Sequence, residues 1–171
     1  NPPVTYSWMY PKDCPANLDC FKDLEKGLSY ARDVNKPVMI DFTGYACFNC
    51  RKMEENVWPK KDVFKNLKNE YVVISLYVDD RAELAAEDQI TVNQKHGGQR
   101  KLKTIGDKWH HFQTEFFNNN SQPLYVLMSP DGKLLNTPVG YTPDENEYNH
   151  FLNCGLEAFE TLNGEDALGI K

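Results

Sequence analysis

Apolar residues change their spacing along this chain, and the changes predict a series of helices and strands. After Asn17, a residue type that often caps helices, apolar residues recur every three or four positions. This spacing predicts a helix that ends near Pro37. Its apolar positions are Leu18, Phe21, Leu24, Leu28 and Ala31. Three further runs are nearly all apolar, as is typical of buried strands. They cover residues 38–42, 71–78 and 124–128.

A polar stretch between residues 80 and 121 interrupts this alternation. Residues 90–93 and 101–105 alternate in character around Gly97-Gly98, which predicts a β-hairpin, and residues 109–117 predict a helix. The stretch is longer than ordinary loops, so we interpret it as an insertion over about 80–121.

The remaining segments supply more helices and one more strand. Helices are expected over residues 47–57, where Pro59 ends the run, and over about 62–69. Residues 133–139 follow a Pro-Asp-Gly turn and predict an antiparallel partner for the strand before it. A last helix is expected after Thr142-Pro143-Asp144, which carries the start signals of a helix.

The order of these elements predicts the fold class and the domain organisation. Helices and strands alternate before the insertion, and two strands and a helix follow it, which calls for an α/β fold. We expect a mixed central sheet with helices on both faces and an inserted hairpin and helix. One domain is expected over residues 17–171, after a proline-rich tail or linker over residues 1–16.

Composition and charge exclude several classes of protein. Of the 171 residues, 40% are hydrophobic, which suits a folded domain rather than a disordered chain. The net charge of −6 argues against nucleic acid as a partner. The longest apolar run, residues 71–78, is far shorter than a bilayer-crossing helix, so no membrane span is expected. The first residue is not Met and no leader follows, so the chain is interpreted as part of a longer precursor.

Cys47 and Cys50 lie where a predicted buried strand gives way to a helix. A helix start offers unpaired N–H groups and a partial positive charge, which stabilise a thiolate at Cys47. Two intervening residues keep Cys50 close enough to attack a mixed disulfide at Cys47, so the pair suits dithiol–disulfide exchange. Zinc binding and inert buried thiols are the alternatives, but zinc needs four ligands and no second pair has ligand spacing. We expect no metal and no cofactor.

Two acidic residues are expected to flank the two sulfurs. Asp41 lies on the strand that leads into the site, where a carboxylate could receive or return the Cys50 proton. Glu54 follows Cys50 by four residues and Cys47 by seven, which places it on the same helix face. Negative charge opposes thiolate formation and burial raises carboxylate pKa values, so we expect a reducing protein. In the alternative interpretation, Asp41 bonds to backbone, and Glu54 is a solvated acid paired with a basic neighbour, Arg51 or Lys52.

The other candidate residues carry weaker signals. Tyr45 and Phe48 flank the dithiol and could contact a partner protein, although core packing is an equal interpretation for Tyr45. Cys14 and Cys20 could form a structural disulfide or a second redox pair, and we favour free or structural thiols. Cys154 falls off the apolar stripe of the last helix and is expected to be a packed or partly covered thiol.

Several motifs together resemble a known family. Val38-Met39-Ile40-Asp41-Phe42 is followed by Cys47-x-x-Cys50, and Gln122-Pro123 then precedes a predicted hairpin and Gly140. This arrangement resembles the thioredoxin fold over residues 18–160. The segment from Asp41 to Glu54 and the ending Val139-Gly140-Tyr141-Thr142-Pro143 are similar to the C-terminal periplasmic domain of the thiol:disulfide interchange protein DsbD, especially its Bacteroidetes versions.

The resemblance implies roles for particular residues. Cys47 would be the attacking thiol and Cys50 the resolving one, with Asp41 and Glu54 as the acids that modulate them. A cis bond between Gln122 and Pro123 would lie beside the dithiol, and its backbone would pair with a partner strand. The sequence departs from thioredoxin between the cysteines, where Phe48-Asn49 replaces Gly-Pro, and at Ser75, where thioredoxins often carry a lysine.

The resemblance also implies partners and a location. The chain is predicted to be a periplasmic thiol–disulfide reductase that is part of a membrane-anchored precursor. It would pass reducing equivalents to the disulfides of periplasmic proteins, including those that act in cytochrome c biogenesis. Its partners would be periplasmic proteins with disulfides, and an upstream transmembrane or redox domain of the same precursor would reduce it. The alternatives are a disulfide oxidase or isomerase, which needs a less reducing dithiol, and a redox-silent protein-binding module.

Overall fold

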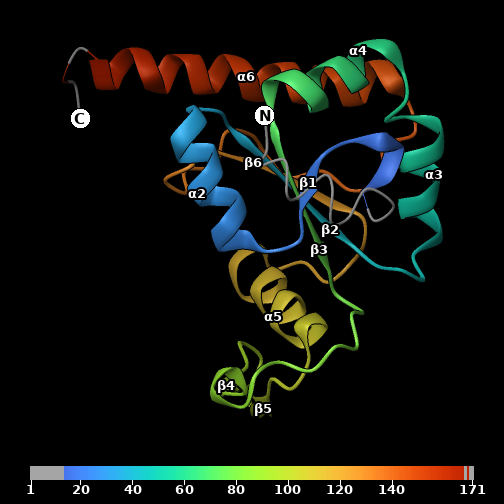
Figure 1. The fold of residues 1–171 in the computed structure, drawn as a ribbon, viewed down its shortest axis with the longest axis vertical. Coiled ribbons are helices and arrows are strands. Elements are labelled where there is room, and N and C mark those ends of the chain that lie inside the picture. Colours follow the sequence, from blue (N-terminus) through green and yellow to red (C-terminus); the bar gives the residue numbers. More distant parts are fainter. Residues whose placement is uncertain (1–13, 168, 170–171) are drawn as a thin grey trace.

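The centre of the molecule is a four-stranded mixed sheet (Figure 1). The computed structural model describes residues 14–167 and 169, so most of the expected tail over residues 1–16 lies outside the described residues. The strand order is β1, β3, β2, β6; β1 and β2 run parallel to β3, and β6 runs antiparallel to β2. The three predicted buried strands are confirmed. The strands are β1 Cys20–Phe21, β2 Val38–Thr43, β3 Val72–Tyr77 and β6 Leu124–Met128.

Side chains on successive positions of each strand enter two separate cores, because a strand alternates its faces. On β2, Met39 joins one core, whereas Ile40 and Phe42 join the other. Asp41 shares the parity of Met39 and therefore lies on the face that Met53 of α3 covers. Each large side chain that is fully buried in these cores contributes roughly 1.5–3 kcal/mol to stability.

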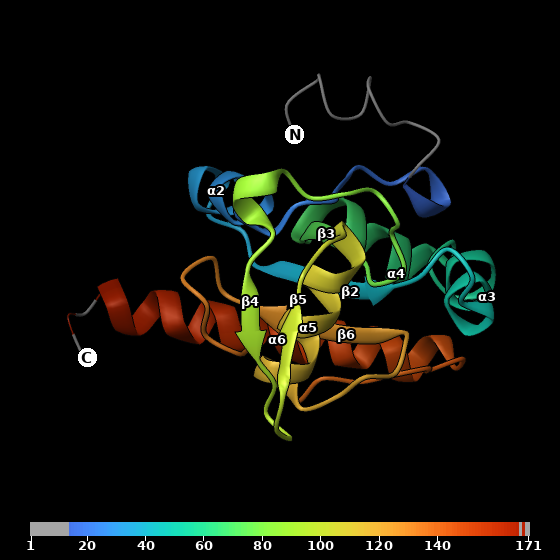
Figure 2. The same ribbon diagram turned by 90° about the horizontal axis from the view of Figure 1, so that it is seen from below.

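Helices cover both faces of the sheet, which confirms the predicted α/β class (Figures 1 and 2). One core is closed by α2 and α5, and the other by α3, α4 and α6. Short helical turns connect some of these elements. The α-helices are α2 Leu24–Val34, α3 Phe48–Asn56, α4 Lys61–Lys65, α5 Ile105–Phe117 and α6 Glu145–Ala167, and the turns are η1 Pro15–Asn17, η2 Asn66–Glu70 and η3 Ala86–Asp88.

The predicted start of the first helix at Asn17 is wrong. Asn17 has φ 57°, in the left-handed region, and the two residues Cys20 and Phe21 form a strand that pairs with β3. The helix starts only at Asp23, whose carboxylate accepts a hydrogen bond of 3.0 Å from the backbone N–H of Lys26. A short edge strand and the following helix happened to place apolar residues at helical spacing.

The insertion forms the predicted hairpin and helix. Strand β4 Thr91–Asn93 pairs antiparallel with β5 Gln99–Lys101. Helix α5 begins with a capping box in which Thr104 and Asp107 exchange hydrogen bonds. Its second residue, Gly106, packs so closely on the end of β3 that a Cβ would lie 2.7 Å from the Val78 carbonyl oxygen. Glycine therefore allows the inserted helix to dock on the sheet.

The predicted strand over residues 133–139 forms only in part. Single bridges join Tyr125 to Val139 and Met128 to Leu134, both antiparallel, without a continuous strand between them. The two bridges are five residues apart on this segment but only three apart on β6, so the extra residues bulge out of the ladder and interrupt it. The last helix starts as expected, because the Asp144 carboxylate accepts hydrogen bonds from two backbone N–H groups. Within the described residues, no helix combines the length and hydrophobicity that a bilayer crossing requires.

Candidate active site

Cys47 and Cys50 lie at the start of α3 and are joined by a disulfide. Cys47 is the N-cap of the helix, and its Sγ lies 3.2 Å from the backbone N of Cys50. The Cys50 side chain is 1% exposed, whereas Cys47 is half-buried. A partner disulfide can therefore reach the sulfur of Cys47 more readily than that of Cys50. The helix start supplies the N–H groups and partial positive charge expected to favour a thiolate there.

The loop that leads to Cys47 is held by the residue that follows β3. The Asp79 carboxylate accepts hydrogen bonds from the backbone N–H groups of Tyr45, at 2.8 Å, and Ala46, at 3.0 Å. A Cβ at Gly44 would lie 3.1 Å from the Asp79 carboxylate, closer than ordinary van der Waals contact. Asp79 therefore fixes the loop backbone immediately before the dithiol. Sequence analysis missed this residue, because it depends on a contact between segments 33 residues apart or more.

Asp41 is buried on the sheet face that α3 covers, close enough to Glu54 and Arg51 of that helix for their charges to act on its carboxyl. Its Oδ2 accepts a hydrogen bond of 3.3 Å from the Ser75 hydroxyl, and its Oδ1 has no hydrogen-bond partner among the described residues. The alternative of a backbone-bonded acid is therefore wrong. Burial, together with the nearby Glu54 carboxylate, raises the pKa of Asp41 to about 8. At neutral pH the carboxyl is mostly protonated and can exchange a proton with a neighbouring group.

Glu54 is a second covered carboxyl, 9% exposed, on the inner face of α3. Burial raises its pKa to about 7, while the Arg51 guanidinium 2.8 Å away acts in the opposite direction. The pairing with Arg51 matches one alternative interpretation, but its premise of a solvated acid is wrong. The expectation that burial raises the pKa of both acids is confirmed at Asp41 and Glu54.

Arg51 ties Glu54 to the end of β2. Its Nη2 donates hydrogen bonds to Thr43 Oγ1, at 3.2 Å, and to the Gly44 carbonyl, at 3.3 Å. The same nitrogen donates to Glu54 Oε1. This arrangement places the positive charge of Arg51 between the dithiol helix and the strand that carries Asp41. Position 75, where thioredoxins often carry a lysine, is a serine in this sequence and supplies no charge.

Replacing Arg51 by glutamine is expected to raise the pKa of Glu54 by about 1, because it removes the opposite charge that favours the carboxylate. An NMR titration of the Glu54 side-chain carboxyl carbon would measure this change. Lys52→Gln is the matched control, because the Lys52 ammonium lies 4.6 Å from the ring centroid of Phe48 and forms no ion pair with Glu54 within the described residues. An unchanged Glu54 titration in Arg51→Gln would show that the ion pair has no electrostatic effect.

The Gln122-Pro123 peptide bond is cis, as the family resemblance implied. Leu124, the next residue, pairs with Phe42 of β2, so Pro123 lies at the end of the sheet from which the dithiol loop leaves. The Gln122 side chain donates a hydrogen bond of 2.8 Å to the Gln113 side chain of α5. A Cβ at Gly140 would lie 3.5 Å from the Pro123 carbonyl oxygen, so the two loops are neighbours.

Tyr45 and Phe48 are among the most exposed large apolar residues, with exposed fractions of 53% and 71%. The Tyr45 ring stacks on Tyr77 with centroids 4.1 Å apart, and the Lys22 ammonium lies 5.6 Å from the Tyr45 ring centroid. Core packing therefore does not describe Tyr45, which covers Tyr77 with one face and remains open on the outside. Their roles in binding a partner stay predictions.

The remaining cysteines differ in part from expectation. Cys14 and Cys20 form a disulfide with a Cα separation of 5.8 Å, so the favoured interpretation as thiols is wrong. The half-buried Cys154 is a free thiol whose sulfur lies 3.5 Å from His150 Nε2. In the described part of the chain, no cluster of three or more His, Cys, Asp or Glu residues could hold a metal ion.

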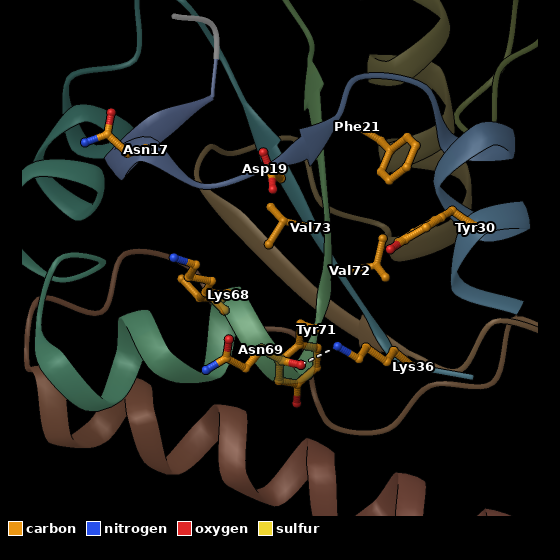
Figure 3. Close-up of a pocket in the computed structure, with 11 residues that line it drawn as sticks. Asn17, Asp19, Phe21, Tyr30, Lys36, Lys68, Asn69, Tyr71, Val72 and Val73 are labelled. Atoms are coloured by element: carbon orange, nitrogen blue, oxygen red, sulfur yellow. Dashed lines mark hydrogen bonds between the residues drawn. The ribbon is translucent and has the colours of Figure 1, made fainter. Parts of the chain in front are cut away.

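The cavity in Figure 3 lies away from the dithiol. It has a volume of about 170 Å³ and is lined by residues of β3 and by neighbouring residues such as Lys36 and Lys68. The Lys36 ammonium donates a hydrogen bond to the Asn69 carbonyl and so closes part of the opening. None of the candidate site residues lines this cavity. The chemistry therefore concentrates at an exposed loop rather than in an enclosed pocket.

Comparisons with known proteins agree with this geometry. Residues 24–154 match the thioredoxin-like domain family. A solved structure named DsbH oxidoreductase is similar with a TM-score of 0.59 and 16% identity, over 84% of this chain and 87% of that chain. A thioredoxin from Thermus thermophilus gives a TM-score of 0.53 and 17% identity, over 78% and 84% of the two chains. The comparison with curated proteins found no match. Because the family match spans most of the residues, this chain belongs to the thioredoxin-like domain family.

Proposed function

We propose that this chain is a protein-disulfide reductase that works by dithiol–disulfide exchange. The observation that carries the proposal is the pair of unequal sulfurs at the start of α3, with Cys47 accessible and Cys50 covered. The buried carboxyl of Asp41 lies on the same side of the sheet and has an unbonded oxygen. The reduced pair can thus pass electrons outward to a partner disulfide while a proton acceptor lies on the inner side.

The exchange transfers two electrons and two protons to the partner. The Cys47 thiolate attacks one sulfur of the partner disulfide, so a mixed disulfide forms and the partner's own bond breaks. The released partner sulfur takes up a proton. Cys50 then loses its proton and attacks the Cys47 sulfur, which closes the Cys47–Cys50 disulfide and releases the second partner sulfur as a thiolate that takes up a proton from water. We propose that the ionised form of Asp41, which is the minor form at neutral pH, accepts the Cys50 proton, with Glu54 tuning the Asp41 pKa.

The proposed direction is reduction of the partner. A carboxylate near a thiol raises the thiol pKa and so disfavours the thiolate, which opposes the helix-start effect at Cys47. Stabilised thiolates are what make a dithiol strongly oxidising, and the acids reduce that stabilisation. The name of the DsbH oxidoreductase, a similar structure, is compatible with either direction.

The proposed setting is the periplasm, within a membrane-anchored precursor. Support comes from the motifs shared with the C-terminal domain of DsbD, chiefly Asp41, the Cys47-x-x-Cys50 pair and Glu54. An upstream transmembrane or redox domain would reduce the Cys47–Cys50 disulfide after each cycle. The substrates would be periplasmic proteins with disulfides, including cytochrome c maturation factors.

Equilibration with a series of glutathione redox buffers tests the direction. We expect a reduction potential near that of thioredoxin, about −270 mV, read from the fraction of alkylated Cys47 and Cys50 by mass spectrometry. A potential above about −180 mV would instead favour an oxidase or isomerase. A pair that never changes between thiol and disulfide across the series would favour a redox-silent binding module.

A further inference from the structure

The inserted hairpin and the start of α5 together carry a charge opposite to that of the whole molecule. Residues 94–111 contain five Lys or Arg and one Asp, a net charge of +4, within a chain whose net charge is −6. The rest of the chain therefore carries −10. Three of the four histidines also lie in this segment. Such a separation of charge creates a local field that attracts acidic groups to the hairpin.

The basic side chains of the hairpin are presented to solvent. Every residue from 93 to 101 is exposed, and the two-stranded sheet of β4 and β5 stands apart from the central sheet (Figure 1). Among the described residues, no ion pair neutralises the ammonium groups of Lys95, Lys101 or Lys103. These charges contribute little to the fold, so another molecule is free to pair with them.

The hairpin is nevertheless held in a fixed position. The Arg100 guanidinium pairs with Asp107 at the start of α5, and Glu115 of the same helix accepts a hydrogen bond of 3.0 Å from the Lys95 backbone N–H. The backbone N–H of Leu84 also bonds to the Lys103 carbonyl at 2.9 Å. The two acidic residues of α5 anchor the hairpin, which is therefore a rigid arm rather than a loose loop.

A hollow of about 160 Å³ separates the hairpin from α5. Its lining includes two of the five Lys and Arg residues of the segment 94–111 and all three of its histidines, with Glu115 as the single acidic side chain. A carboxylate of another molecule would meet several hydrogen-bond donors there. The basic lining residues are Lys95, His96, Arg100, His110 and His111.

The base of the arm adjoins the dithiol loop. Asp79, which fixes the backbone of Tyr45 and Ala46, is immediately followed by Asp80, whose carbonyl accepts a hydrogen bond from Gly106 of α5. β2 and β3 are parallel, so the insertion leaves the sheet at the same end as the dithiol loop. A partner held by the arm is thus kept near the end of the sheet from which the loop to Cys47 leaves.

We propose that this hairpin is a docking arm that selects acidic, disulfide-bearing partner proteins. The inference rests on the proposed function for its redox step and adds the chemical class of the substrate. A protein partner is favoured over nucleic acid because a few carboxylates on a protein can pair with the basic groups of the arm. A nucleic acid is a long polyanion, so it would also be repelled by the strongly acidic rest of the chain. The six acidic residues of α6, which has no Lys or Arg, lie at the opposite end of the molecule in Figure 1.

Docking is tested separately from redox chemistry with a fluorescein-labelled, glutamate-rich peptide that contains no cysteine. Anisotropy at low salt is expected to show binding that high salt abolishes. The matched glutamine-rich peptide should bind at least about tenfold more weakly. The triple change Lys95→Glu, Lys101→Glu and Lys103→Glu should weaken binding of the acidic peptide by about tenfold or more.

The control variant carries the same change in net charge on α4 and its N-cap. Lys60→Glu, Lys61→Glu and Lys65→Glu alter exposed lysines away from the insertion and should leave most of the binding intact. Equal losses in the two triple variants would overturn the proposal, because net charge alone would then govern binding. Circular dichroism of both variants would verify that the fold is retained.

The same peptides, closed by a disulfide, connect docking to reduction. The acidic substrate is expected to show a kcat/KM about tenfold above that of the neutral one, and the hairpin variant should lose this preference while reducing the neutral peptide normally. If no peptide is reduced but the acidic one binds the hairpin, the proposed function fails and the docking arm stands. Equal rates for acidic and neutral substrates would contradict the inferred substrate class.

Other occupants give distinct results. Binding of single-stranded DNA, and of vesicles that contain anionic lipid, is compared with binding of the acidic peptide. If either bound more tightly and the hairpin changes abolished that tighter binding, the proposal of a protein partner would be overturned. Self-association at low salt that the hairpin changes abolish would assign the arm to the acidic surface of a second copy. Sedimentation velocity and vesicle flotation provide these measurements.

Discussion

Replacing Cys50 by alanine is expected to convert a transient mixed disulfide into a stable covalent adduct at Cys47. The variant retains the accessible sulfur and the helix start that stabilises its thiolate, but it lacks the covered thiol that resolves the bond. Reduced variant protein mixed with a disulfide-bearing protein should therefore accumulate an adduct that intact mass spectrometry detects. Trapping should rise from near zero in the unaltered protein to a large fraction of the molecules.

The reverse variant supplies the control for this trap. Cys47→Ala leaves only Cys50, which is 1% exposed, so adduct formation should fall to a small fraction of that in Cys50→Ala. Adding dithiothreitol should release the partner from the trapped species. Equal trapping by both single-cysteine variants would contradict the assigned order of attack, even if the chain were a redox protein.

Replacing Asp41 by asparagine is expected to stabilise the folded protein at alkaline pH. The pKa of Asp41 is raised from 3.8 to about 8 by burial. Between these values the folded state keeps a proton that the unfolded state has lost, so the free energy of unfolding decreases as pH rises. The asparagine variant has no carboxyl to titrate, so its free energy of unfolding does not decrease in this way. Near the upper end of this pH range it should be more stable than the unaltered protein by about 3 kcal/mol, after allowance for the interaction with Glu54.

Urea unfolding near both ends of this pH window measures the effect. The gain in Asp41→Asn should be small at the acidic end and grow toward the alkaline end. Asp33→Asn, a change at an exposed carboxylate on α2, is the matched control and should show no such growth. A gain that does not depend on pH would mean that Asp41 titrates normally in the folded protein.

The same variant should also slow proton transfer from Cys50. Asparagine cannot accept a proton, so resolution of the mixed disulfide should depend on solvent alone. Stopped-flow measurement of resolution should show a rate lower by roughly 10²-fold near neutral pH, the usual contribution of a positioned base. Added buffer base should recover part of this loss, an outcome that a purely structural role for Asp41 would not give.

Much of the fold follows from local pattern. The runs that became β2, β3 and β6 are nearly all apolar because both faces of each strand are covered. The edge strand β1 was missed because it is only two residues long and its pairing with Val73 is not encoded in local spacing. Likewise, the extra residues between Leu134 and Val139 that interrupt the pairing with β6 have no signal in the alternating pattern.

The candidate site likewise contains some features that local sequence predicts and others that depend on contacts between distant segments. Spacing alone relates Cys47, Cys50 and Glu54, because they share one helix, and parity along β2 places Asp41 on the side that the helix covers. The clamp from Asp79 and the position of Pro123 depend on distant segments that meet only in the folded sheet. The Cys14–Cys20 disulfide was considered from the sequence but not favoured, since a separation of six residues does not determine the Cα distance.

A single-turnover experiment tests most directly whether this dithiol passes electrons to a protein disulfide. Fully reduced chain would be mixed with a slight excess of an oxidised protein that has one disulfide, quenched with acid, and alkylated for mass spectrometry. The expected result is that each chain gains the Cys47–Cys50 disulfide as the partner gains two thiols, in equal amounts. Exchange at this site would be contradicted if the partner became reduced while Cys47 and Cys50 remained thiols. It would also be contradicted if no electrons were transferred although the partner disulfide was the more easily reduced of the two.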